Sequence, residues 1–567
     1  MIPRPAKFFS GPSLAFSLCS TLTLCGFGVP VALGQESPAL DTKSAVVKGQ
    51  IAPRLQNLGD YKHPVTTSSP RAQLFFNQGL TLTFGFNHRE AGRSFREVAR
   101  LDPDCAMAYW GQALVLGPNI NMPMPPSAEP QAYELIQKAV ALKAKVSERE
   151  RAYIDALATR YSNEEKPDRK ALDRAYAEAA RQLSERYPND LDAATLYAEA
   201  LMDLRPWNYW TKDGRPYPKT LEIVSVLESV LERNPNHPLG IHLYIHAVEA
   251  VKPELAEAGA DRLGKLAPGA GHLVHMPSHI YRRVGRYADA SEANVQAIAA
   301  DEDYITQCRA QGIYPLGYYP HNIHFLWDAA SMEGRSEVAI DAARKVASKL
   351  SAEKLREMPM LNSFAVVPLF AYTRFGKWEE ILQEPRPADD LLFLAGIWHY
   401  ARGLAFTATG RLGAAATELE SLDKIAADKS LQELALFSPN PGAPIIKIAA
   451  EVLAGRLAAK RGETEKAIAH LHRAVLLEDA LVYTEPADWH YPVRQSLGAV
   501  LLQAGRAAEA ETVYWEDLRR NPENGWSLFG LMKSLEAQGK TEQAEEIEQR
   551  FRKAWTRANV TLAASRF

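Results

Sequence analysis

Apolar residues along most of this chain recur at steps of three and four, which is the period of an amphipathic helix. The stretch IAAEVLAGRLAAKRGETEKAIAHLHRAVLLED shows the pattern, with two such segments on either side of a short polar turn. We find no stretch that alternates apolar and polar residues at every second position, as a half-buried β-strand would. The pattern therefore predicts an all-α protein.

The helical pairs also share a common phase. In three separate units a glycine is followed 12 residues later by an alanine: Gly79 and Ala91, Gly455 and Ala467, Gly498 and Ala510. Large residues such as Phe95 and Tyr514 follow each alanine. Small residues let two helices approach closely, and large ones fill the groove toward the next unit. The sequence thus predicts a stack of similar helical hairpins.

This pattern resembles the tetratricopeptide repeat, a pair of antiparallel helices of about 34 residues. The resemblance runs from about Arg71 to about Arg552. It implies an all-α, tetratricopeptide-type helical-hairpin solenoid, or superhelix, whose concave groove binds ligands. We expect a signal peptide (1–34), an N-terminal extension (35–70), N-terminal repeats with inserts (71–235), a histidine-rich central section (236–350) and C-terminal repeats (351–567).

The first residues have the layout of a secretory signal peptide. Arg4 and Lys7 precede an apolar stretch, residues 14–31, and a short run of small residues that ends at Gly34. Cleavage there predicts a secreted or periplasmic protein without a membrane span. The alternative is an uncleaved membrane anchor.

Composition removes several functional classes. A net charge of -3 argues against a nucleic-acid-binding protein, which would carry a strong basic excess. The chain has no glycine-rich phosphate loop, no GxSxG elbow and no HExxH helix. Outside the predicted signal peptide the cysteines are Cys105 and Cys308, and the sequence leaves open whether they pair.

Histidines are concentrated in the central section, where eight of the chain's 14 lie between residues 237 and 324. Aligning the turns of three successive units places seven of them on first helices: His242, His246, His272, His275, His279, His321 and His324. Steps of three and four residues keep such side chains on one helical face. Glu249 and Asp328 fall on the same faces. This register predicts that His246, His279 and His324 converge.

Clustered imidazoles point to a transition-metal site, because the imidazole nitrogen is the commonest ligand for such ions. The predicted ligands are His242, His246, His275, His279, His321 and His324, and the further ligands or orienting groups are Glu249, His272 and Asp328. No thiolate lies among them, which favours Cu, Zn or Fe.

Two classes of function follow from this prediction. A metal ion with an open coordination position can activate water or dioxygen, so one interpretation is an enzyme acting on a small-molecule substrate. The alternative is a non-enzymatic scaffold that binds a peptide or protein partner in the concave groove.

Three features qualify this picture. Pro277 either kinks the second of the three helices or begins it, and this makes His272 the least secure ligand. The insert RAQGIYPLGYYPHN carries Tyr318 and Tyr319, and it either covers the groove or is a packed connector. Arg282 follows His279 by about one helical turn and is a candidate contact for an anionic ligand. Arg282, Tyr318 and Tyr319 are therefore the predicted groove residues.

Overall fold

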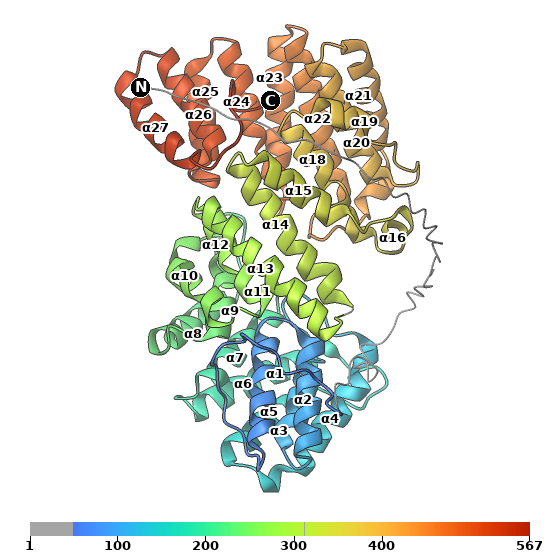
Figure 1. Cartoon of the computed structure of the whole chain (residues 1–567), viewed down its shortest axis with the longest axis vertical. Helices are drawn as coiled ribbons and strands as arrows, with labels where there is room; N and C mark the ends of the chain where they lie inside the picture. The colour runs from blue at the N-terminus through green and yellow to red at the C-terminus, as the bar shows by residue number, and fades with distance from the viewer. Residues whose placement is uncertain (1–48, 311) are drawn as a thin grey trace, which may run out of the picture. The chain divides into compact units, whose positions relative to one another are not determined.

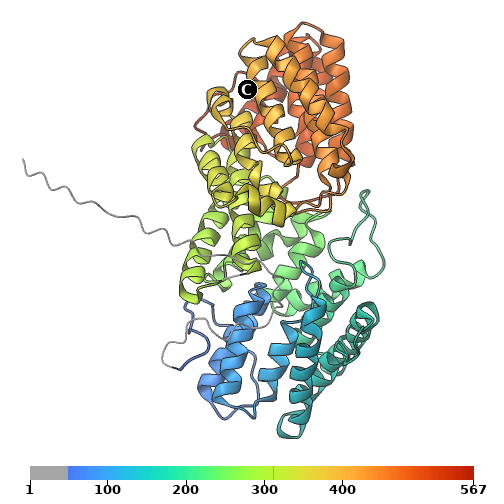
Figure 2. The ribbon, with the colours of Figure 1, turned by 90° about the vertical axis from the view of Figure 1, so that its right-hand side faces the viewer.

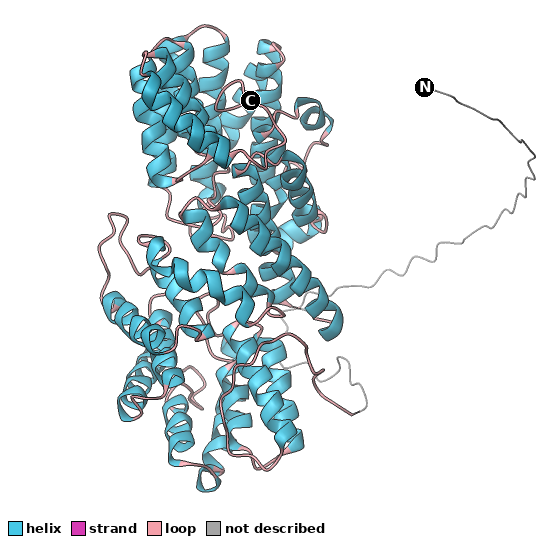
Figure 3. Ribbon diagram, turned by 60° about the vertical axis from the view of Figure 1, so that its left-hand side comes forward, coloured by secondary structure: helices cyan, strands magenta, loops and turns pink. Residues whose placement is uncertain are grey.

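The computed structural model describes residues 49–310 and 312–567 (Figure 1). The predicted signal peptide and the start of the predicted extension lie outside these residues. The described residues are helix and loop, with three isolated β-bridges and no strand (Figure 3). The predicted all-α fold is confirmed. Among the described helices, none combines the length and apolar character that crossing a bilayer requires.

The N-terminal section holds helices α1 to α8 and two short 3-10 turns. Their bounds are α1 (Pro70–Phe84), α2 (His88–Leu101), α3 (Ala106–Leu114), η1 (Pro126–Ala128), α4 (Glu129–Ala141), η2 (Lys143–Lys145), α5 (Glu148–Ala158), α6 (Arg169–Arg186), α7 (Leu191–Asp203) and α8 (Thr220–Arg233). Two long loops, 115–125 and 204–219, interrupt this section where the proline-rich inserts were expected.

The central section runs from α9 to α15. Its elements are α9 (Pro238–Val248), η3 (Pro253–Ala256), α10 (Glu257–Leu266), α11 (Gly271–His275), α12 (Pro277–Arg283), α13 (Tyr287–Cys308), the π-helical turn η4 (Tyr314–Tyr318), α14 (Tyr319–Met332) and α15 (Ser336–Ala347). The predicted connector is thus a packed helical turn that leads directly into α14.

The C-terminal section runs from α16 to α27, and Figure 2 shows its longer helices side by side as hairpins. It begins with α16 (Ala352–Glu357), η5 (Pro359–Leu361), α17 (Asn362–Ala365), α18 (Val367–Arg374), α19 (Trp378–Gln383), α20 (Leu392–Ala408), α21 (Leu412–Ala426) and η6 (Lys429–Gln432). It ends with α22 (Gly442–Lys460), α23 (Thr464–Ala480), α24 (Val493–Gln503), α25 (Ala507–Arg520), α26 (Gly525–Ala537) and α27 (Thr541–Ala554).

Glycines allow the helices of neighbouring hairpins to meet. A Cβ atom on Gly79 of α1 would lie 2.7 Å from the ring of Phe95, and one on Gly111 of α3 would lie 2.6 Å from the same ring. The large side chain is therefore held between the first helices of two consecutive units. Gly498 and Gly530 hold Tyr514 in the same way, at the same spacing along the chain. This confirms the predicted packing of small against large residues.

Short glycine turns close the hairpins. Gly285, between α12 and α13, has a φ of +82°, and Gly505, between α24 and α25, has a φ of +73°. This left-handed conformation strains a residue that carries a Cβ atom, so glycine suits the turn. Both turns are where the hairpin alignment predicts them.

Two large hydrophobic cores and one small cluster lie in the described chain, and α14 contributes to both large cores. Ala329 belongs to the core that begins near the N-terminal section, and Trp327 to the core that extends into the C-terminal section. The histidine-rich helices lie where these cores adjoin. Cys105 and Cys308 are both buried and unpaired in the structure.

Candidate metal centre

Six central histidines form two groups of three. The first triad is His242, His246 and His272, and the second triad is His275, His279 and His321. Within each triad the ligand nitrogens lie within 4.8 Å of one another. Helix α9 supplies two members, α11 two, α12 one and α14 one. The central helices therefore bring together side chains that are up to 79 residues apart in the sequence.

Pro277 kinks the chain between the two triads. Helix α11 ends at His275 and α12 begins at Pro277, while Met276 between them keeps helical angles (φ -50°, ψ -37°). The chain thus continues through a kink, which is the first of the two predicted alternatives. His272 stays within reach of α9 and is a full member of the first triad.

Hydrogen bonds orient the rings of the first triad from behind. The Nδ1 of His242 lies 2.7 Å from the backbone oxygen of Phe84, at the end of α1. A carbonyl oxygen can only accept, so the proton of a neutral His242 is on Nδ1 and the lone pair is on Nε2. The Nδ1 of His246 faces Glu249 at 3.3 Å. The two Nε2 atoms face each other at 3.2 Å.

The second triad repeats this arrangement with different partners. The Nδ1 of His275 lies 2.7 Å from Oδ1 of Asn294. The amide nitrogen of Asn294 donates to the backbone oxygen of Ala290 at 2.8 Å, which fixes Oδ1 as an acceptor. His275 therefore turns an unprotonated Nε2 toward the Nε2 of His279, 3.0 Å away. Such outer hydrogen bonds set the tautomer of metal-binding histidines.

These nitrogen–nitrogen distances match those between neighbouring ligands of one ion. Ligand nitrogens about 2.0–2.1 Å from a metal, at coordination angles between about 90° and 109°, are about 2.8–3.4 Å apart. The Nε2 pairs at 3.2 Å and 3.0 Å both fall within that interval. A histidine pair one helical turn apart supplies two ligands in this way, and a third histidine completes each group.

His272 gives an independent indication. Its side chain is buried, with a relative exposure of 2%. Neither ring nitrogen has a hydrogen-bond partner among the described residues. Leaving a buried polar group unpaired costs about 1–3 kcal/mol. A metal ion held with His242 and His246 would satisfy one of these nitrogens.

The first triad is electrically neutral. Burial lowers the pKa of His242 and of His272 well below the usual value, and the charges of the neighbouring imidazoles lower both further. Burial also lowers the pKa of His246, against the opposing effect of Glu249. Neutral imidazole is the form that binds metal ions.

The second triad contains one charged ring. Burial alone would lower the pKa of His279, but Glu249 and Glu485 outweigh it and raise the pKa to about 10. The Nδ1 of His279 lies 2.7 Å from Glu249 and 3.2 Å from Glu485. Burial would raise the pKa of Glu249, yet His279 and His246 lower it to about 2. These two carboxylates and His279 form a third group with ligand atoms within 4.8 Å of one another.

Aromatic side chains enclose the first triad. The ring of Phe86 packs on His242 with centroids 4.7 Å apart, and Tyr318 packs on His272 at 5.0 Å. Trp207, which is 46% exposed, covers His246 at 4.8 Å and donates to Asn121. The predicted concave groove is therefore wrong in one respect: these histidines are buried under side chains from the turn between α1 and α2, from the loop before α8 and from η4.

Two predicted site residues of α14 lie elsewhere. His324 stacks on Trp327 with centroids 5.0 Å apart and belongs to neither triad. Three residues after His321, it is turned about 60° around the helix, toward the C-terminal core. The expected convergence of His246, His279 and His324 is thus corrected, since His321 takes that place beside His279. Asp328 lies about two turns further on and pairs with Arg282.

Of the three predicted groove residues, two lie away from the histidine triads and one contacts them. Arg282 is buried, and its Nε lies 3.1 Å from Asp328, so it faces no groove. Tyr319 donates to Glu302 at 2.8 Å and points away from the triads. Tyr318 packs against His272 as described. Of these three, Tyr318 is the one that contacts the histidines.

The sequence analysis missed the groups that orient the imidazoles. Glu485 comes from the loop between α23 and α24, Phe84 is the last residue of α1, and Phe86 lies in the turn between α1 and α2. These contacts join distant parts of the chain. The sequence could have indicated Asn294, because this residue lies on α13, which forms a hairpin with the helix of His279.

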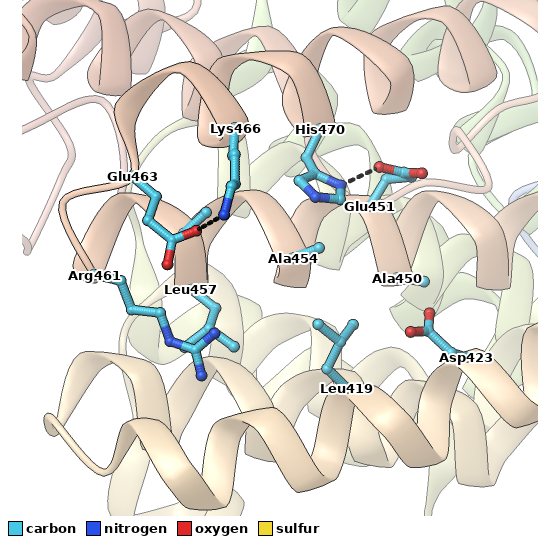
Figure 4. A pocket seen from close by; sticks show the side chains of 11 residues that line it. Leu419, Asp423, Ala450, Glu451, Ala454, Leu457, Arg461, Glu463, Lys466 and His470 are labelled. Atoms are coloured by element: carbon cyan, nitrogen blue, oxygen red, sulfur yellow. Dashed lines mark hydrogen bonds and ion pairs between the residues drawn. The ribbon is translucent and has the colours of Figure 1, made fainter.

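One cavity of the described chain lies away from the two histidine triads. A cavity of about 320 Å³ is lined by α21, α22 and α23 (Figure 4). His470 and Glu451 form an ion pair at its wall, with 2.7 Å between Nδ1 and the carboxylate. None of the three-residue ligand groups lies there.

Comparisons with known proteins give no assignment by sequence. No protein-family model matches the chain, and no curated protein matches it. Among solved structures, the Cut9–Hcn1 hetero-tetramer of the APC/C is 13% identical, with 85% of this chain and 76% of that chain covered and a TM-score of 0.30.

Two further solved structures are similarly distant. A human IFIT1 dimer with m7Gppp-AAAA is 13% identical, with 86% of this chain and 91% of that chain covered and a TM-score of 0.31. The P58(IPK) TPR domain is 13% identical, with 83% and 99% covered and a TM-score of 0.22. Superpositions this loose carry no inference about ligands or partners. The chain's own packing identifies it as an all-α solenoid of tetratricopeptide-type helical hairpins.

Proposed function

We propose that this protein binds transition-metal ions through the two histidine triads of its central section. The arrangement of the Nε2 atoms carries the proposal. In each triad a histidine pair one helical turn apart directs these nitrogens toward each other at ligand-to-ligand distance. Acceptors on the far side of the rings hold the Nδ1 atoms. In the first triad both Nε2 atoms present lone pairs, which polar packing alone does not explain, and in the second triad the Nε2–H of His279 donates to His275, so an entering ion would replace that proton.

The donor set narrows the choice of metal. Six imidazoles and no thiolate suit Cu, Zn or Fe bound through nitrogen. Each triad offers three protein ligands and leaves a coordination position for water or dioxygen, as catalytic metal sites do. The half-buried His321 and the exposed Trp207 mark the sides from which a small molecule would approach. An enzymatic role therefore remains part of the proposal.

Export is also part of the proposal, because residues 1–34 have the pattern of a signal peptide. N-terminal sequencing of protein recovered from the periplasm or the medium should place the first residue near Gln35. Intact chain beginning at Met1 in the cytoplasm would contradict it.

Elemental analysis tests metal binding directly. Purified protein, loaded with Zn, Cu or Fe and then dialysed, should keep a stoichiometric amount of one of these metals. Its thermal unfolding midpoint should also rise, because a ligand that binds the folded state stabilises it by about 2.7 kcal/mol at 100 times its Kd. A protein that keeps no metal and gains no stability would leave the peptide-binding scaffold as the better account.

A variant control separates the triads from other histidines. His472 lies on α23 and is exposed. His472→Ala should retain as much metal as the natural protein. Equal loss in His472→Ala and in a triad variant would show nonspecific binding to surface imidazoles.

A further inference from the structure

The two triads lie against each other. The ring centroids of His246 and His279 are 5.5 Å apart, and those of His272 and His275 are 5.7 Å apart. Each of these pairs joins one member of the first triad to one of the second. Two ions, one in each triad, would therefore be close neighbours.

Glu249 links the triads chemically. One of its carboxylate oxygens lies 3.3 Å from Nδ1 of His246, and the other lies 2.7 Å from Nδ1 of His279. Its side chain is almost fully buried, so no water replaces either contact. A single carboxylate thus supports one ligand of each triad, as the outer carboxylates of metal sites do.

We propose that the centre binds two ions at the same time, one in each triad, and that the ion is copper(I). This inference rests on the proposed function and deepens it by naming the number and the kind of ion. The buried charge around the triads and the number of ligands in each triad support it.

Buried charge favours ions of low charge. The six imidazoles bring none once an entering ion has displaced the proton of His279, and the carboxylates that face them are Glu249 and Glu485. Arg283 lies 3.7 Å from Glu485, and Arg282 is already paired with Asp328. About one negative charge is therefore left to balance the metal. Two monovalent ions repel each other about a quarter as strongly as two divalent ions at the same separation.

Coordination number points the same way. Each triad supplies three nitrogens, and no further carboxylate or thiolate belongs to the first triad. Copper(I) has a filled d shell, imposes no fixed coordination angles, and can therefore accept three nitrogens at the separations of 3.2 Å and 3.0 Å found here. Zn²⁺ would take a water as its fourth ligand in each triad, but for two Zn²⁺ ions the protein offers too little negative charge.

Copper(I) titration under anaerobic conditions tests the proposal. The natural protein, titrated in the presence of a chromogenic copper(I) chelator and then desalted, should retain two copper ions per chain. His272→Phe should retain one, because the ring of His272 makes no hydrogen bond and its replacement leaves the other contacts intact. His321→Phe, at a half-buried position, should also retain one. The double variant should retain none.

The outcomes separate the two levels of the argument. No retained metal in the natural protein would overturn the proposed function itself. One ion that both single variants abolish would leave a metal site but overturn the pair. Retention of two zinc ions in preference to copper would overturn the choice of copper(I).

Electron paramagnetic resonance adds a readout of proximity. After oxidation to copper(II) with ferricyanide, the natural protein should give a signal broadened or diminished by interaction between the two spins. The single variants should give the sharp signal of one isolated copper(II). A sharp signal that accounts for two copper ions in the natural protein would show that they are not neighbours.

Discussion

The two triads use the same side chain at the same helical spacing, yet their surroundings differ. Behind the first triad lie a backbone carbonyl, the ring of Phe86 and one oxygen of Glu249 at 3.3 Å, and burial keeps its imidazoles neutral. Behind the second lie two buried carboxylates, which hold a proton on His279. The comparison teaches that the ligand nitrogens determine which ions a triad can bind. The groups that contact the other side of the rings determine whether the ion must first displace a proton.

Stability should show the largest difference between the triads. In His279→Phe, Glu249 and Glu485 lose the cation between them, and an uncompensated buried charge costs about 3–5 kcal/mol. In His242→Phe the loss is one hydrogen bond to a carbonyl, worth about 0.5–1.5 kcal/mol. Urea unfolding of the metal-free variants measures both. Equal losses would mean that the carboxylates do not distinguish the second triad.

The pH dependence of metal affinity should be the next largest effect. Because the pKa of His279 is raised to about 10, an ion entering the second triad at pH 7 must displace one proton. Zinc affinity of His272→Phe, which keeps the second triad, should therefore fall about tenfold for each unit of decreasing pH. His321→Phe, which keeps the first triad, should show a nearly flat profile, because its rings are already neutral.

Calorimetry supplies the check on this prediction. Titrations in two buffers of different ionisation enthalpy count the protons released on binding. We expect about one proton for the second triad and none for the first. Proton release from the first triad alone, or equal proton release from both triads, would contradict the proposed difference in protonation between them.

The support of His275 by Asn294 should produce a smaller effect. Asn294→Ala removes the closer of the two oxygens at Nδ1 of His275 and leaves Ser278 Oγ at 3.2 Å, so metal binding should weaken toward the lower end of the range of about 10–100-fold that is typical of such a loss. The weakening should be confined to the second triad. Gln296→Ala, an exposed change on the same helix, is the matched control and should leave both affinities unchanged.

His324 should have the smallest effect. Replacing it with phenylalanine keeps a ring on Trp327 and removes both nitrogens. Metal content measured after dialysis should equal that of the natural protein. Loss of an ion in this variant would instead support the sequence-based prediction that His246, His279 and His324 converge on one site.

The sequence predicted the fold and most of the histidines that the structure brings together, because both depend on local periodicity. The spacing of Gly79 and Phe95 predicted how hairpins meet, and the four-residue steps predicted the pairs His242–His246 and His275–His279. These features depend on the 3.6-residue turn of a helix, which is the same wherever the helix lies.

The remaining features depend on contacts between distant segments. Glu485 contacts His279 from a loop of the C-terminal section, and Phe86 contacts His242 from the turn between α1 and α2. No periodicity within the central helices indicates either residue. The kink at Pro277 and the rotation of His324 toward Trp327 are likewise set by packing between helices.

X-ray absorption at the metal edge tests the central claim most directly. Copper-loaded protein should show a first shell of about three nitrogen atoms near 2.0 Å, with the outer scattering that imidazole rings produce. Histidine-to-phenylalanine changes in either triad should halve the metal content and leave this shell unchanged. A shell of sulfur, or of oxygen atoms without imidazole scattering, would contradict the assignment of the histidine triads as the metal centre.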